Sequence, residues 1–205
     1  MTDHVQTNDF ADIQDLMLTA RRGALLSGPI LVAAGSIYGA ASLLVWMSST
    51  GDISLAAPVQ GWIWLAADAV FCPILYMQLV ALRLAGSRRE DSLRRTVGSA
   101  WWGVGAAVLA LVFAYGAASA SLNDGRVWMG SALSLFALYG MAWLVMTAAA
   151  RRGWMAAVGL GSLGVAVLAG FLINSPVAYL LFAAGLVALL ALPGLMLIHC
   201  AERPA

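Results

Sequence analysis

Residues 177–199 read VAYLLFAAGLVALLALPGLMLIH, a run of 23 residues without an acidic side chain, a lysine or an arginine. A helix needs about 20 apolar residues to cross a hydrocarbon core about 30 Å thick, so this segment is long enough to span a membrane. The same criterion predicts five more spans in the chain. The six predicted helices cover residues 24–48, 60–84, 98–120, 127–150, 154–173 and 177–199.

The composition of the whole chain agrees with a membrane protein. Of its 205 residues, 62% are hydrophobic and 10% are charged, against roughly 45 to 50% and 25% in ordinary soluble domains. A soluble domain of this size must cover most of its surface with polar groups, which this composition does not allow. We therefore expect an all-α integral membrane protein whose main partner is the lipid bilayer.

Arginine placement predicts how the helices are oriented, because short cytoplasmic loops collect positive charges. If both termini lie in the cytoplasm, the helices run up and down as hairpins and Arg126 is the only arginine on the outer side. Asp52, Asp124 and Asn174 then lie in short outer turns. The pattern predicts a multi-pass protein of the cell inner (plasma) membrane. The ten arginines predicted to face the cytoplasm are Arg21, Arg22, Arg83, Arg88, Arg89, Arg94, Arg95, Arg151, Arg152 and Arg203.

The chain is predicted to hold one membrane domain with short flanking segments. Its first residues lack the basic start and apolar centre of a cleavable signal peptide. Phe10, Ile13 and Met17 recur there at helical spacing, so we expect a short amphipathic helix on the inner membrane surface, which either docks a partner or leads into the first span. The predicted parts are a cytoplasmic N-terminal segment (1–23), a six-helix transmembrane domain (24–199) and a cytoplasmic tail (200–205).

Several functional classes are excluded by counting residues. Eleven basic residues, all arginine, and ten acids leave no basic excess for nucleic acid. His4 and His199 lie near the chain ends, so no histidine pair can hold a haem inside the bundle. An intramembrane aspartyl protease needs two aspartates, and only Asp68 lies deep in a span. Cys72 and Cys200 are predicted at opposite depths, so we expect no disulfide. We expect no enzyme activity, no cofactor and no metal site.

Asp68 lies near the middle of the second predicted span. An ionised carboxylate at that depth costs at least about 2.5 kcal/mol, and no arginine lies at a matching depth to compensate it. The choices are protonation, a water-filled cavity or hydrogen bonds from hydroxyl groups. Because ionisable residues in membrane helices are often functional, Asp68 is the main candidate for a proton, ion or substrate site.

Three further side chains of the second span could act with Asp68. Cys72 and Tyr76 follow it by one and two helical turns, and Gln78 comes next along the sequence. Under a functional interpretation these side chains line a route for a proton or a cation. Under a structural interpretation Asp68 is protonated and bonded to a serine of a neighbouring helix. The serines considered for that bond are Ser36, Ser134 and Ser162.

Two prolines inside the predicted spans are candidate hinges. Pro73 lies in the second span, and Pro193 with Gly194 interrupts the sixth. Proline lacks a backbone N–H and its ring clashes with the preceding turn, so each position predicts a kink. Either kink could let a helix move, or it could be an ordinary feature of a membrane helix.

Small residues predict where the helices pack closely, because lipid tails are as apolar as leucine and association depends on close contact. Residues 38–42 and 115–119 both read Tyr-Gly-Ala-Ala-Ser, through either duplication of a hairpin or chance. We expect the small-residue stripes to form contacts within the chain, with a dimer face as the alternative. The stripes are Gly35 with Gly39, Gly130 with Ser134, and Ser162 with Ala166 and Gly170.

Two functions are compatible with these features. The first is a small-solute or ion carrier or channel, in which Asp68 is protonatable and the two prolines allow helix movement. The alternative is a non-catalytic membrane subunit or sensor that binds a partner of a membrane complex or a second copy of itself as a homo-oligomer. The surfaces considered for that binding are the N-terminal helix, the Gly35/Gly39 face and the arginine-rich loop 87–95.

Overall fold

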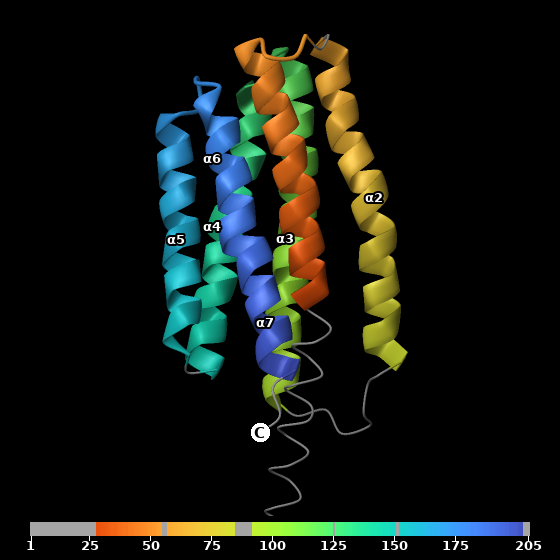
Figure 1. Cartoon of the computed structure of the whole chain (residues 1–205), viewed down its shortest axis with the longest axis vertical. Coiled ribbons are helices and arrows are strands. Elements are labelled where there is room, and N and C mark those ends of the chain that lie inside the picture. Colours follow the sequence, from red (N-terminus) through yellow and green to blue (C-terminus); the bar gives the residue numbers. More distant parts are fainter. Residues whose placement is uncertain (1–27, 55–56, 85–91, 125, 151, 203–205) are drawn as a thin grey trace, which may run out of the picture.

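The computed structural model describes residues 28–54, 57–84, 92–124, 126–150 and 152–202. Within those residues all regular structure is helical, and six helices are long and apolar enough to cross a membrane (Figure 1). The first helix covers Gly28–Thr50. The others are α2 (Ala57–Leu84), α3 (Ser92–Leu122), α4 (Arg126–Ala150), α5 (Gly153–Phe171) and a last span divided into α6 (Val177–Leu186), η1 (Val187–Ala191) and α7 (Leu192–Glu202).

The prediction of an all-α protein with six apolar spans is confirmed. The sixth apolar window runs from Val177 to His199, as the sequence predicts, and the bounds of the other five differ from the prediction by a few residues. Backbone conformation explains two of the ends. Gly51, with φ of 87°, and Asn123, with φ of 50°, adopt left-handed conformations directly after the first and third helices, and glycine and asparagine tolerate such conformations best.

The amphipathic helix predicted around residues 10–20 lies outside the described residues, as does most of the arginine-rich loop 87–95.

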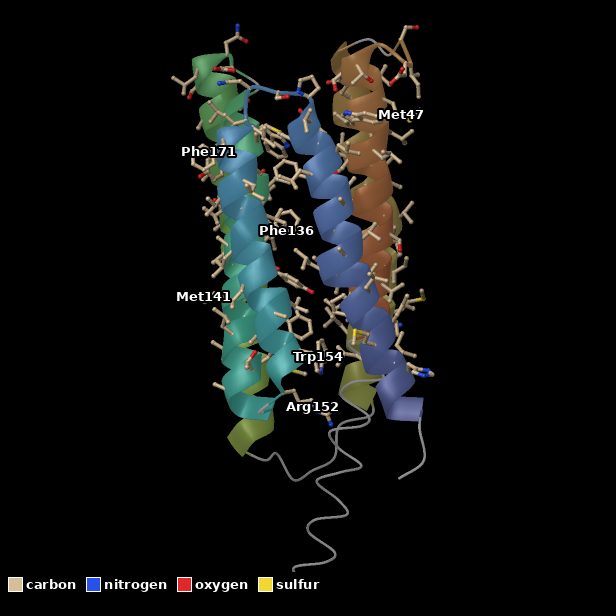
Figure 2. All side chains as sticks on the ribbon, turned by 60° about the vertical axis from the view of Figure 1, so that its left-hand side comes forward. Met47, Phe136, Met141, Arg152, Trp154 and Phe171 are labelled. Carbon is tan, nitrogen blue, oxygen red and sulfur yellow. The ribbon has the colours of Figure 1, made fainter. Side chains whose placement is uncertain are left out.

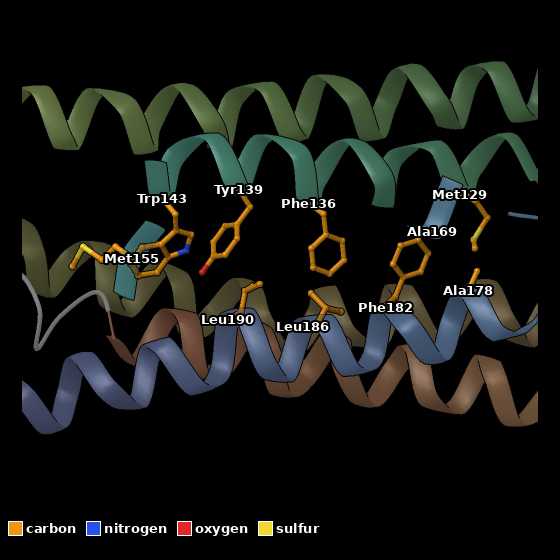
Figure 3. Packing of buried hydrophobic residues seen from close by; sticks show 10 residues of the cluster. All are labelled: Met129, Phe136, Tyr139, Trp143, Met155, Ala169, Ala178, Phe182, Leu186 and Leu190. Carbon is orange, nitrogen blue, oxygen red and sulfur yellow. The ribbon is translucent and has the colours of Figure 1, made fainter. Parts of the chain in front are cut away.

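The hydrophobic core lies between α4, α5 and the last span (Figure 3). Phe136 of α4 stacks on Phe182 of α6 with ring centroids 5.9 Å apart. Trp143, only 1% exposed, contacts Tyr139 and Trp154 with centroids 6.0 and 5.5 Å away. Aromatic side chains of this size bury much surface and prefer such offset arrangements. The row of rings therefore defines one packed interior along α4.

The last span is interrupted by one turn of π-helix, η1, directly before Leu192 and Pro193. In a regular α-helix the proline ring would meet the carbonyl group four residues earlier, which here belongs to the wider π turn. Gly35 of the first helix packs on this turn. A Cβ atom at Gly35 would lie 2.6 Å from the Ala191 nitrogen and 2.7 Å from the Leu186 carbonyl oxygen. Only glycine allows so close an approach.

The small-residue stripes mostly form contacts within the chain, as expected. Gly39 faces Val187 of η1, which leaves the Gly35/Gly39 face covered by the chain's own last span. This corrects the alternative in which that face binds a partner. Gly130 packs against the ring of Tyr115, and Ser162 is fully buried. In contrast, a Cβ atom at Gly170 would meet nothing within 4 Å.

The helices α2 and α3 contribute little to the core. None of the residues in the apolar window of α3 is buried, and only 6% of those in α2 are, against 44% in the last span. Figure 3 shows α3 on the side of α4 that faces away from the core, and Figure 1 shows α2 at the edge of the bundle. Both helices therefore present most of their spans outward. Met47 and Phe171 lie near one end of the bundle, and Arg152 lies near the other (Figure 2).

Candidate functional site

Asp68 lies near the middle of the second apolar window, Val59–Ala81. The helix α2 continues without a break from Ala57 to Leu84 and includes Pro73. The residue before the aspartate, Ala67, is only 6% exposed, whereas Asp68 itself is exposed. Asp68 is therefore at the edge of the surface that α2 turns toward the rest of the chain.

The carboxyl group of Asp68 accepts a hydrogen bond from the hydroxyl group of Tyr38, with 2.6 Å between the Tyr38 oxygen and Asp68 Oδ1. Tyr38 belongs to the first helix, and its ring contacts the ring of Phe71 edge-on with centroids 5.4 Å apart. Nearer the turn, Gln60 Nε2 donates to Ser48 Oγ at 3.2 Å. Polar contacts at two depths thus link the first helix to α2.

Tyr38 is not among the partners predicted for Asp68, although the sequence contains a signal for it. Tyr38 and Asp68 are each 15 residues from Ile53, one before it and one after it. Two antiparallel helices joined by a short turn bring such positions to the same height, because the helical rise per residue is constant. A search for hydroxyl groups at equal distance from the turn would have selected Tyr38.

The expected serine partners of Asp68 were wrong. Ser134 of α4 lies 3.4 Å from the Tyr115 hydroxyl group, and Ser162 of α5 donates to the Val158 carbonyl oxygen at 2.8 Å. Ser36 is exposed on the first helix. The structural interpretation needs a hydroxyl group at the depth of Asp68 on an adjacent helix, and the tyrosine on the first helix meets that requirement.

Asp68 belongs to an outward-facing row of α2 that we call the Asp68 face: Gly61, Leu65, Asp68, Cys72 and Tyr76. Successive members are three or four residues apart, so they follow one side of the helix. Leu65 is 56% exposed, Tyr76 is 69% exposed and the Cys72 thiol is free and exposed. A Cβ atom at Gly61 would meet nothing within 4 Å. All five residues of the row are exposed, although Asp68 also contacts Tyr38 of the first helix.

Gln78 does not join the Asp68 face. It is half-buried, whereas Tyr76 is exposed, and residues two apart in an α-helix point in directions about 200° apart. Gln78 also lies ten residues from Asp68, about 15 Å along the helix axis. Tyr76 and Gln78, which the sequence predicts to line a route together, therefore lie on different sides of α2.

No described cation compensates Asp68. The basic side chains that the structure describes are Arg152 and His199, which lie at the ends of spans. Ionised Asp68 would cost at least about 2.5 kcal/mol in lipid, and one hydrogen bond to a charged group contributes about 1.5 to 3 kcal/mol. The Tyr38 bond engages only one carboxyl oxygen. In lipid the second oxygen needs a proton, water or another polar surface.

The second candidate hinge, Pro193, is fully buried. The adjacent Gly194 contacts the first helix so closely that a Cβ atom would lie 2.8 Å from the Gly28 carbonyl oxygen. Movement at Pro193 would have to break this contact, whereas Pro73 on α2 is exposed. A hinge movement is therefore more restricted at Pro193 than at Pro73, although both prolines lie inside predicted spans. The side chain of Cys200 lies outside the described residues.

Comparisons with family models, with curated proteins and with solved structures find no match. Among the described residues no three histidine, cysteine, aspartate or glutamate side chains come together as metal ligands would. The candidate site is therefore defined by the Asp68 face and its contact with Tyr38.

Proposed function

We propose that this polytopic membrane protein is a non-catalytic subunit that associates with another protein in the plane of the membrane through the Asp68 face. The observation that carries the proposal is the exposure of a mid-span carboxyl group on a helix with only 6% of its apolar window buried. A lone polar group facing lipid is unfavourable by several kcal/mol at most depths. A protein partner would replace lipid at this surface and supply polar contacts.

The location of Asp68 favours association over transport through the chain itself. A carrier is expected to hold its ionisable group at an internal site between helices. The described interior between α4, α5 and α6 is filled by the aromatic row around Phe136 and Trp143. Asp68 lies outside that row, on the edge helix α2. The geometry therefore supports contact with a neighbour more strongly than a pathway through the core.

The orientation proposed with this function follows the arginines. Helices run alternately out and back, the turn at residues 51–54 faces outward, and both termini lie in the cytoplasm of a cell whose inner (plasma) membrane holds the protein. Arg152 lies at the end opposite Met47, which fits this arrangement (Figure 2). A cysteine introduced at Asp52 should react with an impermeant reagent added outside intact cells, and protection there would contradict the orientation.

Lateral association can be tested with two bulky substitutions of matched depth. Cys72→Trp changes the Asp68 face, whereas Val70→Trp changes an equally outward position, 56% exposed, on another side of α2. The full chain purified in mild detergent should have a protein mass above the 21.4 kDa of one copy. Light scattering should show that Cys72→Trp lowers this mass to that of one chain and that Val70→Trp does not. A one-chain mass for the unchanged protein would contradict the proposal.

A second candidate function is a proton- or cation-coupled carrier or channel. It is favoured by the Tyr38–Asp68 hydrogen bond, because a carboxyl group that gains or loses a proton there would alter the contact between two helices. Asp68→Asn should then abolish flux into vesicles at unchanged expression, while lateral association persists. Equal flux for the two proteins would exclude this role.

A further inference from the structure

We infer that the protein covering the Asp68 face is a second copy of this chain, so that two α2 helices pair around a two-fold axis along the membrane normal. The inference rests on the proposed lateral association and names its partner. Most soluble oligomers are homo-oligomers with closed symmetry, and a two-fold interface places the same surface of both subunits in contact.

Depth is the first argument for a second copy. Two copies inserted in the same orientation hold every residue at the same height in the bilayer. A polar group near the middle of the span, Asp68, therefore meets polar groups of the second copy at its own level. A partner of different sequence would need an independent polar residue at that height, and ionisable residues are rare in membrane helices.

The spacing along α2 is the second argument. Gly61, Leu65, Asp68 and Cys72 are separated by four, three and four residues, the alternation that keeps one seam facing a parallel helix. Gly61 and Cys72 are small enough for close approach, and the space beside Gly61 is open. Tyr76, 69% exposed, lies one turn further along α2, beside this row. A parallel pair of α2 helices can therefore interlock along this row.

Hydrogen-bond complementarity is the third argument. Tyr38 donates to Asp68 Oδ1, and no other described residue bonds to this carboxyl group, so its second oxygen can bond to a partner. A protonated carboxyl group is both donor and acceptor, and two aspartates held together readily share a proton. Two Asp68 side chains meeting at the axis can thus bond to each other while each keeps its own Tyr38.

The exposed face of α3 does not compete with this inference. Its outward residues are small ones together with large apolar ones such as Leu109 and Phe113, and small stripes alone are common in membrane helices. They carry no polar side chain in mid-span, so lipid can cover them without leaving a carboxyl group unsatisfied. The outward small residues of α3 are Gly103, Ala106, Ala110, Ala114 and Ala117.

Disulfide formation between copies tests the pairing directly. With Cys200 replaced by serine, the full chain in phosphatidylethanolamine–phosphatidylglycerol vesicles keeps Cys72 as its only thiol. An added copper–phenanthroline oxidant, which accepts the two electrons, should link two Cys72 residues and double the mass of the chain. A disulfide requires Cα atoms within about 7 Å, so the product reports close contact at this position.

A matched control uses Val70, which is 56% exposed and lies only two residues from Cys72. In the same chain with Cys200 replaced by serine, the variant Cys72→Ser/Val70→Cys places its only thiol about 200° around the helix at nearly the same depth. It should yield no linked dimer under the same oxidation. Equal linking of the two variants would reveal random collision and would overturn the inference.

Substitutions of Asp68 distinguish specific pairing of two chains from non-specific association of their apolar surfaces. Asp68→Asn keeps a donor and an acceptor and should retain dimers in single-molecule photobleaching of dilute vesicles. Asp68→Leu should weaken dimerisation about tenfold, the effect of losing one hydrogen bond of ordinary strength. Unchanged dimerisation of Asp68→Leu would overturn the inference.

The experiments distinguish the absence of a second copy at the Asp68 face from the absence of any lateral association. If the chain purified from its own membranes links through Cys72 to a protein of different mass, the second copy is excluded and lateral association stands. If the unchanged chain has the mass of one copy in mild detergent and forms no Cys72 product, both are excluded.

Discussion

The Gly28–Thr50 helix and α3 contain the same five residues, Tyr-Gly-Ala-Ala-Ser, in very different surroundings. In the first helix Ala41 is 5% exposed, Ser42 is 1% exposed, and Gly39 faces the last span. In α3 the equivalent Ala118 and Ser119 are half-buried, and no residue of the apolar window is buried. The same local sequence is therefore deeply buried against the last span in one helix and only half-buried in the other, where Gly116 packs on the ring of Trp128.

The two Tyr-Gly-Ala-Ala-Ser segments share one feature. The tyrosine of each reaches the helix that follows it in sequence: Tyr38 donates to Asp68, and the Tyr115 hydroxyl group lies 3.4 Å from Ser134 Oγ. The small residues differ because the first helix lies against the last span, whereas α3 lies on the outer side of α4. The local repeat thus governs contacts to the next helix, and the bundle decides which helices become interior.

The largest expected effect of a substitution is at Gly35, where the first helix packs against the last span. Gly35→Leu should destabilise the protein by at least about 3 kcal/mol, because the new side chain meets backbone atoms that cannot rotate away. Gly105→Leu in α3 should change stability little, since a Cβ atom at Gly105 meets nothing within 4 Å. Unfolding of both variants in a denaturing detergent series measures the difference, and similar losses would show that the two helices are equally packed.

A smaller effect is expected at the tyrosines. Tyr38→Phe should cost about 1 to 3 kcal/mol, because it leaves the mid-span carboxyl group without its donor. Tyr115→Phe should cost less than about 1 kcal/mol, since its hydrogen bond is long and weak. The same unfolding measurement applies. Adding Asp68→Leu to Tyr38→Phe should recover most of the loss, and a purely additive double variant would argue against direct coupling.

The smallest expected effect is at the serines. The sign of the change in stability differs between the two Tyr-Gly-Ala-Ala-Ser segments. Among the described residues Ser42 Oγ is buried without a hydrogen-bond partner, so Ser42→Ala should stabilise the protein by up to about 1 kcal/mol. Ser119 Oγ donates to the Asp124 carbonyl oxygen at 3.0 Å, so Ser119→Ala should destabilise it by about 0.5 to 1 kcal/mol. Thermal unfolding in mild detergent resolves the sign. A destabilised Ser42→Ala variant would contradict the assignment.

The candidate site was predictable only in part. Asp68, Cys72 and Tyr76 follow from helical spacing, because residues three or four apart share one side of any helix. Gln78 was grouped with them by closeness in sequence, although an α-helix turns it to another side. The partner Tyr38 depends on which helices are neighbours, a property that spacing within one helix does not contain.

Sequence alone determined the all-helical class and the six spans, since the length and polarity of each segment decide whether a helix can replace lipid. Only the tertiary structure decided which of these apolar helices form the interior. Hydrophobicity cannot make that choice, because an apolar side chain is as compatible with lipid tails as with the protein interior. Close backbone contacts such as those of Gly35 and Gly194 with their neighbours select the packed faces, and they leave Asp68 at the edge, exposed beside its donor Tyr38.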